Sequence, residues 1–303
     1  MAPREPPSPR FRIERARRGY RVVGPGLLIW EPSLGEAEER RAELEVGWWR
    51  YPAAPPAAGA DGECGPLVYG PVASRRLGRS LGVNLTPAGC RLCTFDCVYC
   101  EWGGIPRRTA GASWPAPREI AGAIAGALAR VGPLDSITLS GHGEPTLHPR
   151  FADVVQAVLE IVRAARPDLA VRILTNGSRA ARPEIRAALD QLDERIVKLD
   201  ASPERVERPG LHHPLGALIA SLALLRDVTL QACFVEGEVA NTDARSVGEW
   251  IELVAEIAPR AVQIYTIDRR PAQSGILPAV AASLEEIACA LRARTGIEAS
   301  VHP

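Results

Sequence analysis

Residues 136–162 read S-I-T-L-S-G-H-G-E-P-T-L-H-P-R-F-A-D-V-V-Q-A-V-L-E-I-V and contain one complete strand–loop–helix unit. The short apolar run Ser136–Leu139 predicts a strand, and the residues after the loop repeat apolar positions with the period of a helix. The apolar face of that helix is formed by Phe151, Val154, Val155, Val158 and Val162. A strand followed directly by a helix is the repeating unit of parallel α/β sheets and barrels.

The same alternation extends from about Ser80 to the end of the chain. Six strands are predicted, at Leu81–Leu85, Ser136–Leu139, Ala170–Leu174, Arg195–Leu199, Val228–Phe234 and Ala261–Ile267. A further helix follows the fifth strand, with Val247, Trp250, Ile251 and Val254 on one face, and Ser283 with Glu286 predicts the capping box of the last helix. A full eight-unit barrel needs about 250 residues, which is more than the chain offers from Ser80 onward. We therefore expect an α/β fold built as a partial (β/α)6 TIM-like barrel, with its ligand site at the carboxyl ends of the strands.

The composition limits the class of protein. The 303 residues include 36 basic and 36 acidic side chains, so the formal net charge is zero, which argues against a protein that coats polyanions generally. No apolar run approaches the roughly 20 residues that cross a bilayer, and the first ten residues lack the apolar stretch of a secretory signal. We expect a cytoplasmic protein without a membrane partner.

The N-terminal residues differ from the rest of the chain. Residues 10–21 are rich in arginine, which favours a solvated basic arm, although contact with RNA or another anion is an alternative. Residues 51–65 are rich in proline, alanine and glycine and are typical of a linker. We therefore predict a small N-terminal extension with its linker at 1–64 and a core domain at 65–303.

Seven cysteines are present, and four of them lie within eleven residues, in C-R-L-C-T-F-D-C-V-Y-C at 90–100. Such clustering indicates metal binding rather than a disulfide framework. The pairs are too close for a zinc ribbon, whereas an iron–sulfur cluster accommodates compact spacing. Cys93, Cys97 and Cys100 form C-x3-C-x2-C, and three thiolates on a four-iron cluster leave one iron open for a small molecule.

This motif, with an aromatic residue before its last cysteine and a position after the first strand, resembles that of the radical S-adenosylmethionine (radical SAM) superfamily. The sequence L-S-G-H-G-E-P-T-L-H-P at 139–149 resembles the glycine–glutamate motif of that family. T-N-G at Thr175–Gly177 and K-L-D at Lys198–Asp200 end the third and fourth strands, where the family presents polar groups to SAM. The resemblance extends over about residues 69–270.

The resemblance implies a set of site residues. Cys93, Cys97 and Cys100 would hold a [4Fe–4S] cluster whose fourth iron chelates SAM, and reduction would cleave SAM to a 5′-deoxyadenosyl radical that takes hydrogen from a substrate. Cys90 is interpreted as a bystander. Gly141 and Gly143 would let the backbone approach the SAM amino group, because a Cβ would block it. The remaining expected cofactor contacts are Tyr99, Glu144, Asn176, Lys198 and Asp200.

Other residues carry weaker indications. Lys198 is the only lysine, and an ammonium is not equivalent to a guanidinium. His142 is expected to be exposed, His148 to cap or pair near the next helix, and Cys233 and Cys289 to pack as inert thiols. Arginines before the first strand and charged residues after the sixth are candidates for binding an anion, and they are Arg75, Arg76, Arg79, Asp268, Arg269 and Arg270. No catalytic residue is identified.

The flanking sequences at 69–85 and 262–271 resemble radical SAM iron–sulfur oxidoreductases related to the enzyme that builds the wyosine base of tRNA. That enzyme has a second cluster on N-terminal cysteines, whereas Cys64 is the only cysteine here before the motif. The substrate therefore stays open between RNA and a small metabolite or peptide. A one-electron reductant such as flavodoxin or ferredoxin is the expected partner. The alternative is a zinc- or iron–sulfur-stabilised binding module without turnover.

Overall fold

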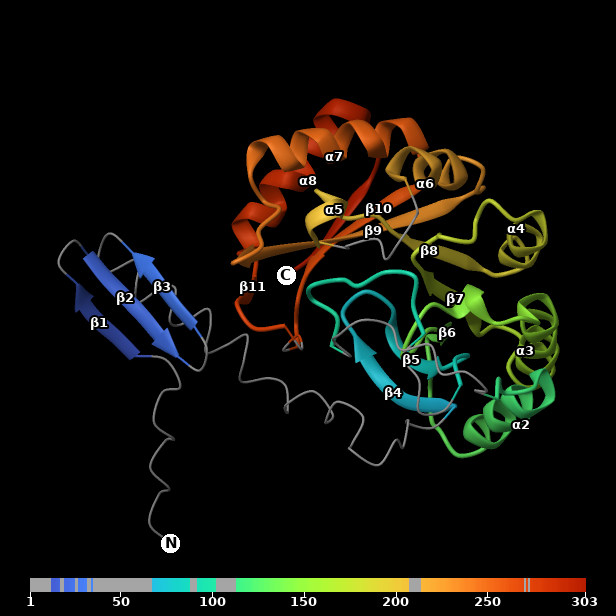
Figure 1. Ribbon diagram of the computed structural model, residues 1–303. Helices are drawn as coiled ribbons and strands as arrows, with labels where there is room; N and C mark the ends of the chain where they lie inside the picture. The colour runs from blue at the N-terminus through green and yellow to red at the C-terminus, as the bar shows by residue number, and fades with distance from the viewer. Residues whose placement is uncertain are drawn as a thin grey trace, which may run out of the picture.

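The structure is a computed structural model and describes residues 12–16, 19–24, 27–31, 34, 67–87, 92–101, 113–206, 214–269, 271 and 273–303. The expected linker at 51–65 lies outside these residues, and so do Cys90 and Arg270. The described strands form a small antiparallel sheet and a large curved sheet (Figure 1). The small sheet consists of β1 (Arg12–Ala16), β2 (Gly19–Gly24) and β3 (Leu27–Glu31).

The large sheet has the strand order β12-β10-β9-β8-β7-β6-β5-β4, and β11 pairs with β9 at its side. The strands are β4 (Val68–Ser74), β5 (Gly78–Val83), β6 (Ser136–Leu139), β7 (Ala170–Thr175), β8 (Glu194–Lys198), β9 (Val228–Gly237), β10 (Ala261–Thr266), β11 (Ile276–Pro278) and β12 (Ala299–His302). From β5 to β10, and on to β12, neighbours pair in parallel, whereas β4 and β11 are antiparallel to their partners. All six predicted strands are present, and their bounds differ from the prediction by at most three residues.

Helices follow the strands, and the longer ones line the outer side of the curved sheet (Figure 1). They are α2 (Pro117–Leu128), α3 (Phe151–Ala165), α4 (Pro183–Leu189), α6 (Leu215–Leu222), α7 (Ala244–Ile257) and α8 (Ala281–Thr295). The short α5 (Pro203–Val206) lies on the inner side, where the carbonyl of Val206 accepts from the N–H of Val98 at 2.8 Å, and a 3₁₀ turn, η1, spans Pro145–Leu147. The predicted apolar faces of α3 and α7 are buried. The fold class is thus an α/β half-barrel, as predicted.

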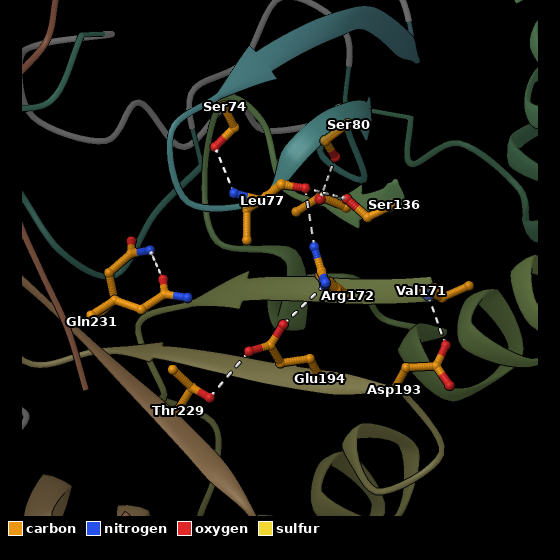
Figure 2. Close-up of polar contacts among 12 residues, drawn as sticks. Ser74, Leu77, Ser80, Ser136, Val171, Arg172, Asp193, Glu194, Thr229 and Gln231 are labelled. Atoms are coloured by element: carbon orange, nitrogen blue, oxygen red, sulfur yellow. Dashed lines mark hydrogen bonds and ion pairs between the residues drawn. The ribbon is translucent and has the colours of Figure 1, made fainter. Parts of the chain in front are cut away.

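The two faces of the large sheet differ in polarity. Residues that point toward the helices are apolar and belong to one continuous core, among them Leu81, Ile137, Ile173, Leu230 and Ile264. The alternate positions, which face the inside of the half-barrel, carry many polar side chains because strand residues alternate between faces. Figure 2 shows several of these inner side chains bonded to one another, with the carbonyl of Leu77 in the β4–β5 turn accepting from Arg172 at 3.1 Å.

One local prediction was wrong. α8 begins at Ala281 after the N-cap Val280, so Ser283 lies inside the first turn and does not cap the helix. The two alanines before Ser283 are strong helix formers and extend the helix past it.

The arginine-rich segment contains strand β1, which pairs with β2 from Arg12↔Val23 to Ala16↔Gly19. The side chains of Glu14 and Arg15 in this strand are exposed, in agreement with a solvated segment.

None of the helices in the described part of the chain combines the length and the apolar character that a bilayer crossing requires.

Trp250 joins α7 to the sheet and provides a test of this packing. Its buried indole nitrogen donates to the carbonyl of Leu199 at 2.9 Å, and its ring meets Phe234 edge to face. Because Trp250→Phe removes this hydrogen bond and leaves a void, we expect the free energy of unfolding in urea to fall by about 1–3 kcal/mol. Arg245→Ala on the exposed side of α7 should change it by less than about 0.5 kcal/mol. Equal effects of the two substitutions would contradict this packing role.

Candidate functional site

The cysteine loop follows β5 and occupies the carboxyl end of that strand. Cys93, Cys97 and Cys100 are all partly exposed there. Phe95, between the first two, is fully buried in the main core and fixes the loop to the sheet. The backbone N–H of Phe95 donates to the sulfur of Cys93 at 3.4 Å, and the N–H of Cys100 donates to the carbonyl of Cys97 at 3.0 Å. The loop thus presents three thiols from a folded, anchored turn.

The glycine–glutamate loop after β6 lies directly against the cysteine loop. The N–H of Glu144 donates to the carbonyl of Leu92 at 2.8 Å. A Cβ on Gly143 would lie 1.8 Å from that carbonyl oxygen, and a Cβ on Gly141, where φ is 152°, would lie 2.5 Å from Oδ1 of Asn84. The expectation was that these glycines make room for SAM. In the structure they make room for the protein's own backbone and for Asn84.

The Glu144 side chain ties its own loop to the end of β7 from a buried position. Its Oε1 accepts from the N–H and hydroxyl of Thr146 at 3.0 and 2.6 Å and from the hydroxyl of Thr175 at 2.5 Å. Its Oε2 accepts from the N–H of Asn176 at 2.8 Å. Burial raises the pKa of this carboxyl, while the four donors oppose that shift. The carboxylate therefore links the ends of β6 and β7 and directs most of its lone pairs to protein donors.

Asn176 lies at the end of β7 and contacts the cysteine loop. Its side-chain N–H₂ donates to the hydroxyl of Thr94 at 2.9 Å and lies 3.6 Å from the sulfur of Cys93. Its carbonyl oxygen accepts from the N–H of Ser178 at 3.0 Å. The sequence predicted a contact with SAM at this position. The structure brings the side chain to a cysteine sulfur, which it orients from the side of β7.

Lys198 and Asp200, at the end of β8, meet Tyr99 of the cysteine loop. The Tyr99 hydroxyl donates to Oδ2 of Asp200 and accepts from the Lys198 ammonium. Oδ1 of Asp200 accepts from the N–H of Cys233 at 2.7 Å. The Lys198 nitrogen also donates to the hydroxyl of Tyr265 at 3.1 Å and lies 3.9 Å from Asp200. Predicted residues of two separate motifs, the cysteine loop and K-L-D, therefore meet here.

Burial and charge determine the protonation of this group of side chains. Burial raises the pKa of Tyr99, and the carboxylate of Asp200 raises it further, so the phenol keeps its proton. Burial by itself would lower the pKa of Lys198, but Asp200 together with Tyr265 and the nearby cysteines outweighs it, and the pKa lies well above its ordinary value. Burial, and then Asp200, raise the pKa of Cys233 to about 12. At neutral pH the group holds an ammonium, a phenol and a thiol.

Other predicted residues have structural contacts of their own. His142 is buried beside Asn84, so the expectation that it is exposed was wrong. His148 accepts from the N–H of Arg150, the N-cap of α3, at 3.1 Å, as predicted for a residue near the next helix. Arg269 pairs with Glu101 at 3.0 Å and so joins the loop after β10 to the cysteine loop. Cys289 is exposed rather than packed.

Sequence reasoning missed Tyr265, which is buried beneath Lys198 and beside Cys233. The signal was present in the sequence. Gln263 and Tyr265 are two residues apart on β10, so both side chains point to the inner face of the sheet. Asn84 was missed as well, because its role depends on the close approach of Gly141, which no local pattern reveals.

Within the described part of the chain, no three histidine, cysteine, aspartate or glutamate side chains converge on a point where one metal ion would be held. A closed zinc site needs its ligands to converge on one ion, whereas in an iron–sulfur cluster each thiolate binds its own iron.

Comparison with known proteins agrees with this geometry. The chain is 34% identical over 213 residues to a UPF0026 protein of Helicobacter pylori, which is 67% of each chain. The chain belongs to the UPF0026 family. It is also 31% identical over 209 residues to a UPF0026 protein of Synechocystis, covering 66% of this chain and 74% of that protein. The family model of the radical SAM superfamily matches residues 89–236, which contain all the predicted cofactor residues.

Solved structures support the same superfamily at the level of fold. A radical SAM methyltransferase from Sphaerobacter thermophilus matches with a TM-score of 0.53 at 19% identity, over 74% of this chain and 65% of that one. Streptococcus suis SuiB bound to S-adenosylmethionine also matches with a TM-score of 0.53, at 12% identity, over 89% of this chain and 55% of that one. This UPF0026 chain thus spans less than two thirds of the length of either solved protein.

The contact between the two loops can be tested by adding one methyl group. In Gly143→Ala the new Cβ meets the Leu92 carbonyl, so the cysteine loop has to move. We expect the free energy of unfolding to fall by about 1–3 kcal/mol and the iron retained after anaerobic reconstitution to fall with it. Gly122→Ala in α2, where nothing lies within 4 Å of the new Cβ, is the matched control and should be neutral or slightly stabilising. Normal iron content in Gly143→Ala would argue against the contact.

Cys233 should resist alkylation in the folded protein. Its thiol is fully buried and, with a pKa of about 12, is ionised in only about one molecule in ten thousand at pH 8, whereas the thiolate is the nucleophile. We expect iodoacetamide at pH 8 to label the exposed Cys289 and to leave Cys233 unmodified until denaturant is added, as measured by peptide mass spectrometry. Labelling of both at similar rates in the native protein would show that this thiol is accessible.

Proposed function

We propose that this UPF0026 protein is a radical SAM enzyme that cleaves S-adenosylmethionine reductively and abstracts hydrogen from a substrate. The observation that carries the proposal is the docking of the cysteine loop on the glycine–glutamate loop, through the Leu92 carbonyl and the N–H of Glu144. This contact joins the two motifs that the superfamily uses for its cluster and for SAM. The superfamily match over residues 89–236, which includes both motifs, supports the proposal.

The residues present fit a [4Fe–4S] cluster with an open iron. Cys93, Cys97 and Cys100 supply three thiolates, and the sulfur of Cys93 has N–H donors from Phe95 and Asn176 that suit a charged sulfur. When bound, the cluster supplies one electron to SAM, whose cleavage gives the hydrogen-abstracting 5′-deoxyadenosyl radical. Cys90 stays a bystander in this proposal, since a fourth thiolate would close the cluster.

The chain's own side chains bind and orient the reactants. The Lys198 ammonium and the Asp200 carboxylate stand at the end of β8, where they can contact polar groups of SAM, and the ring of Tyr99 lies 4.2 Å from the Lys198 nitrogen. Glu144 holds the glycine loop in place through Thr146, Thr175 and Asn176 rather than as a free charge. Because it is largely saturated, we propose that Glu144 acts on SAM through the loop that it positions.

The electron donor is proposed to be a one-electron carrier such as flavodoxin or ferredoxin. The resemblance to the enzyme of wyosine synthesis does not enter the proposed substrate, because the matched relatives are UPF0026 proteins. A small substrate that enters the half-barrel from the carboxyl ends of the strands agrees with the polar inner face.

The proposed reaction is tested by anaerobic reconstitution with iron and sulfide, followed by incubation with SAM and dithionite. Formation of 5′-deoxyadenosine that depends on the reductant is the expected result, measured by liquid chromatography. A protein that holds a complete cluster and yields no 5′-deoxyadenosine would overturn the proposal. Purification with zinc and without iron or sulfide would favour a structural binding module instead.

Substitution of single cysteines distinguishes the ligands from the other thiols. We expect Cys93→Ser, Cys97→Ser and Cys100→Ser to lose most of the bound iron and at least about a hundredfold in 5′-deoxyadenosine formation, because each removes one of three ligands. Cys90→Ser and the exposed Cys289→Ser should keep both properties. Iron content and the 5′-deoxyadenosine rate are the measurements, and loss of iron in Cys90→Ser would contradict the assignment of the ligands.

A further inference from the structure

The inner face of the half-barrel is built from polar side chains that satisfy one another (Figure 2). The Ser80 hydroxyl bonds to that of Thr138 at 2.6 Å. Arg172 pairs with Glu194 at 2.9 Å, and Glu194 also accepts from Thr229 at 3.2 Å. The amides of Gln231 and Gln263 bond at 2.9 Å. Such pairing is expected, since a buried polar group without a partner costs free energy.

Arg76 and Lys198 meet at Tyr265, near the carboxyl end of β10. The Arg76 guanidinium, from the β4–β5 turn, lies over the ring of Tyr265 at 3.8 Å from the ring centroid. Its Nε is buried and has no acceptor in the described part of the chain. Lys198 gives N–H groups to the hydroxyls of Tyr99 and Tyr265, and its nitrogen lies 5.7 Å from the centroid of the same ring. Two cations therefore contact one buried tyrosine.

The carboxylates near these two cations are those of Asp200 and Asp268. Asp200 is the carboxylate next to Lys198, and its two oxygens accept from the N–H of Cys233 and from the Tyr99 hydroxyl. Asp268, after β10, pairs with Arg75 at 3.1 Å rather than with Arg76. Two cations against one carboxylate leave an excess positive charge in a partly buried place.

We propose that Arg76 and Lys198 form a binding site for an oxyanion of the substrate, a carboxylate or a phosphate group, beside Tyr265. The proposal rests on the proposed function and adds the class of substrate to it. A guanidinium carries its N–H donors in one plane, which suits the paired oxygens of a carboxylate or a phosphate. Lys198 supplies a compact ammonium beside the same tyrosine, and charge-assisted bonds of this kind are strong when partly buried.

The site stands next to the proposed reaction centre and not at a remote surface. Tyr99 belongs to the cysteine loop and is bonded to Lys198, so the anion would be held two side chains from the thiols. A substrate fixed by one charged end in this position would present its neighbouring carbon–hydrogen bonds toward SAM. Positioning of this kind is how a cleft with few polar groups sets specificity.

Binding of a simple anion tests the site directly. The protein reconstituted anaerobically and saturated with SAM is titrated with inorganic phosphate, and in a second arm with acetate, by calorimetry and by thermal unfolding. We expect at least one of the two anions to bind and to raise the unfolding temperature. Tighter binding of phosphate would indicate a phosphorylated substrate, and equal or tighter binding of acetate would indicate a carboxylate.

The variants separate this site from general charge. Arg76→Gln should weaken the binding of the anion by about tenfold, and Arg76→Lys should restore part of it. Arg79→Gln is the matched control, because Arg79 is an exposed arginine of the same hairpin on the outer face, and it should bind as the wild type does. If Arg76→Gln does not fold, Lys198→Gln carries the same comparison.

Three results would overturn the site. They are the absence of binding by either anion, equal binding by the wild type and Arg76→Gln, and mutual exclusion of phosphate and SAM, which would make this the place of the SAM carboxylate. The outcome is separable from the proposed function. Phosphate binding through Arg76 without formation of 5′-deoxyadenosine would support the anion site and contradict the radical chemistry. Formation of 5′-deoxyadenosine without binding of either anion would support the radical chemistry and contradict the anion site.

Discussion

The contact between Leu92 and the loop of Gly143 and Glu144 is the constraint on which the site depends. It fixes the cysteine loop, a segment without regular secondary structure, to the end of β6, and it leaves no volume for a side chain at Gly143. Glu144 extends the same connection to β7 through Asn176, whose amide reaches Cys93. Three consecutive strands thereby hold the thiols in place through backbone and buried polar contacts, which is how a loop can be positioned as accurately as a strand.

Side chains along the strands of the curved sheet point alternately outward and inward, and the two faces have different roles. Its outer positions are apolar and pack against the helices in a single core, which supplies most of the stability. Its inner positions carry paired polar groups such as Arg172 with Glu194 and Gln231 with Gln263, so the interior is closed without being apolar.

Much of the fold could be predicted because it depends on local patterns. The six core strands and the apolar faces of α3 and α7 follow from hydrophobic periodicity alone. Features that depend on contacts distant in the sequence could not be predicted. Nothing near Asn176 shows that it meets Cys93, 83 residues earlier. Similarly, Arg76 reaches Tyr265 only because the β4–β5 turn meets the end of β10 across the half-barrel. The start of α8 was mispredicted because two competing local signals, alanine and serine, favour different boundaries.

The zero net charge of the chain illustrates how far composition can constrain function. A balanced total makes long-range attraction of a polyanion weak, because exposed charges are screened within about 10 Å at ordinary ionic strength. It places no limit on a partly buried site, where the local dielectric is lower and two cations act at short range. Arg76 and Lys198 lie in such a place. The nearby carboxylates of Asp268 and Asp200 also bind other groups, namely Arg75 and the N–H of Cys233. Selection of an anionic small molecule inside the half-barrel is therefore compatible with a neutral chain, whereas coating of a nucleic acid by its whole surface is not.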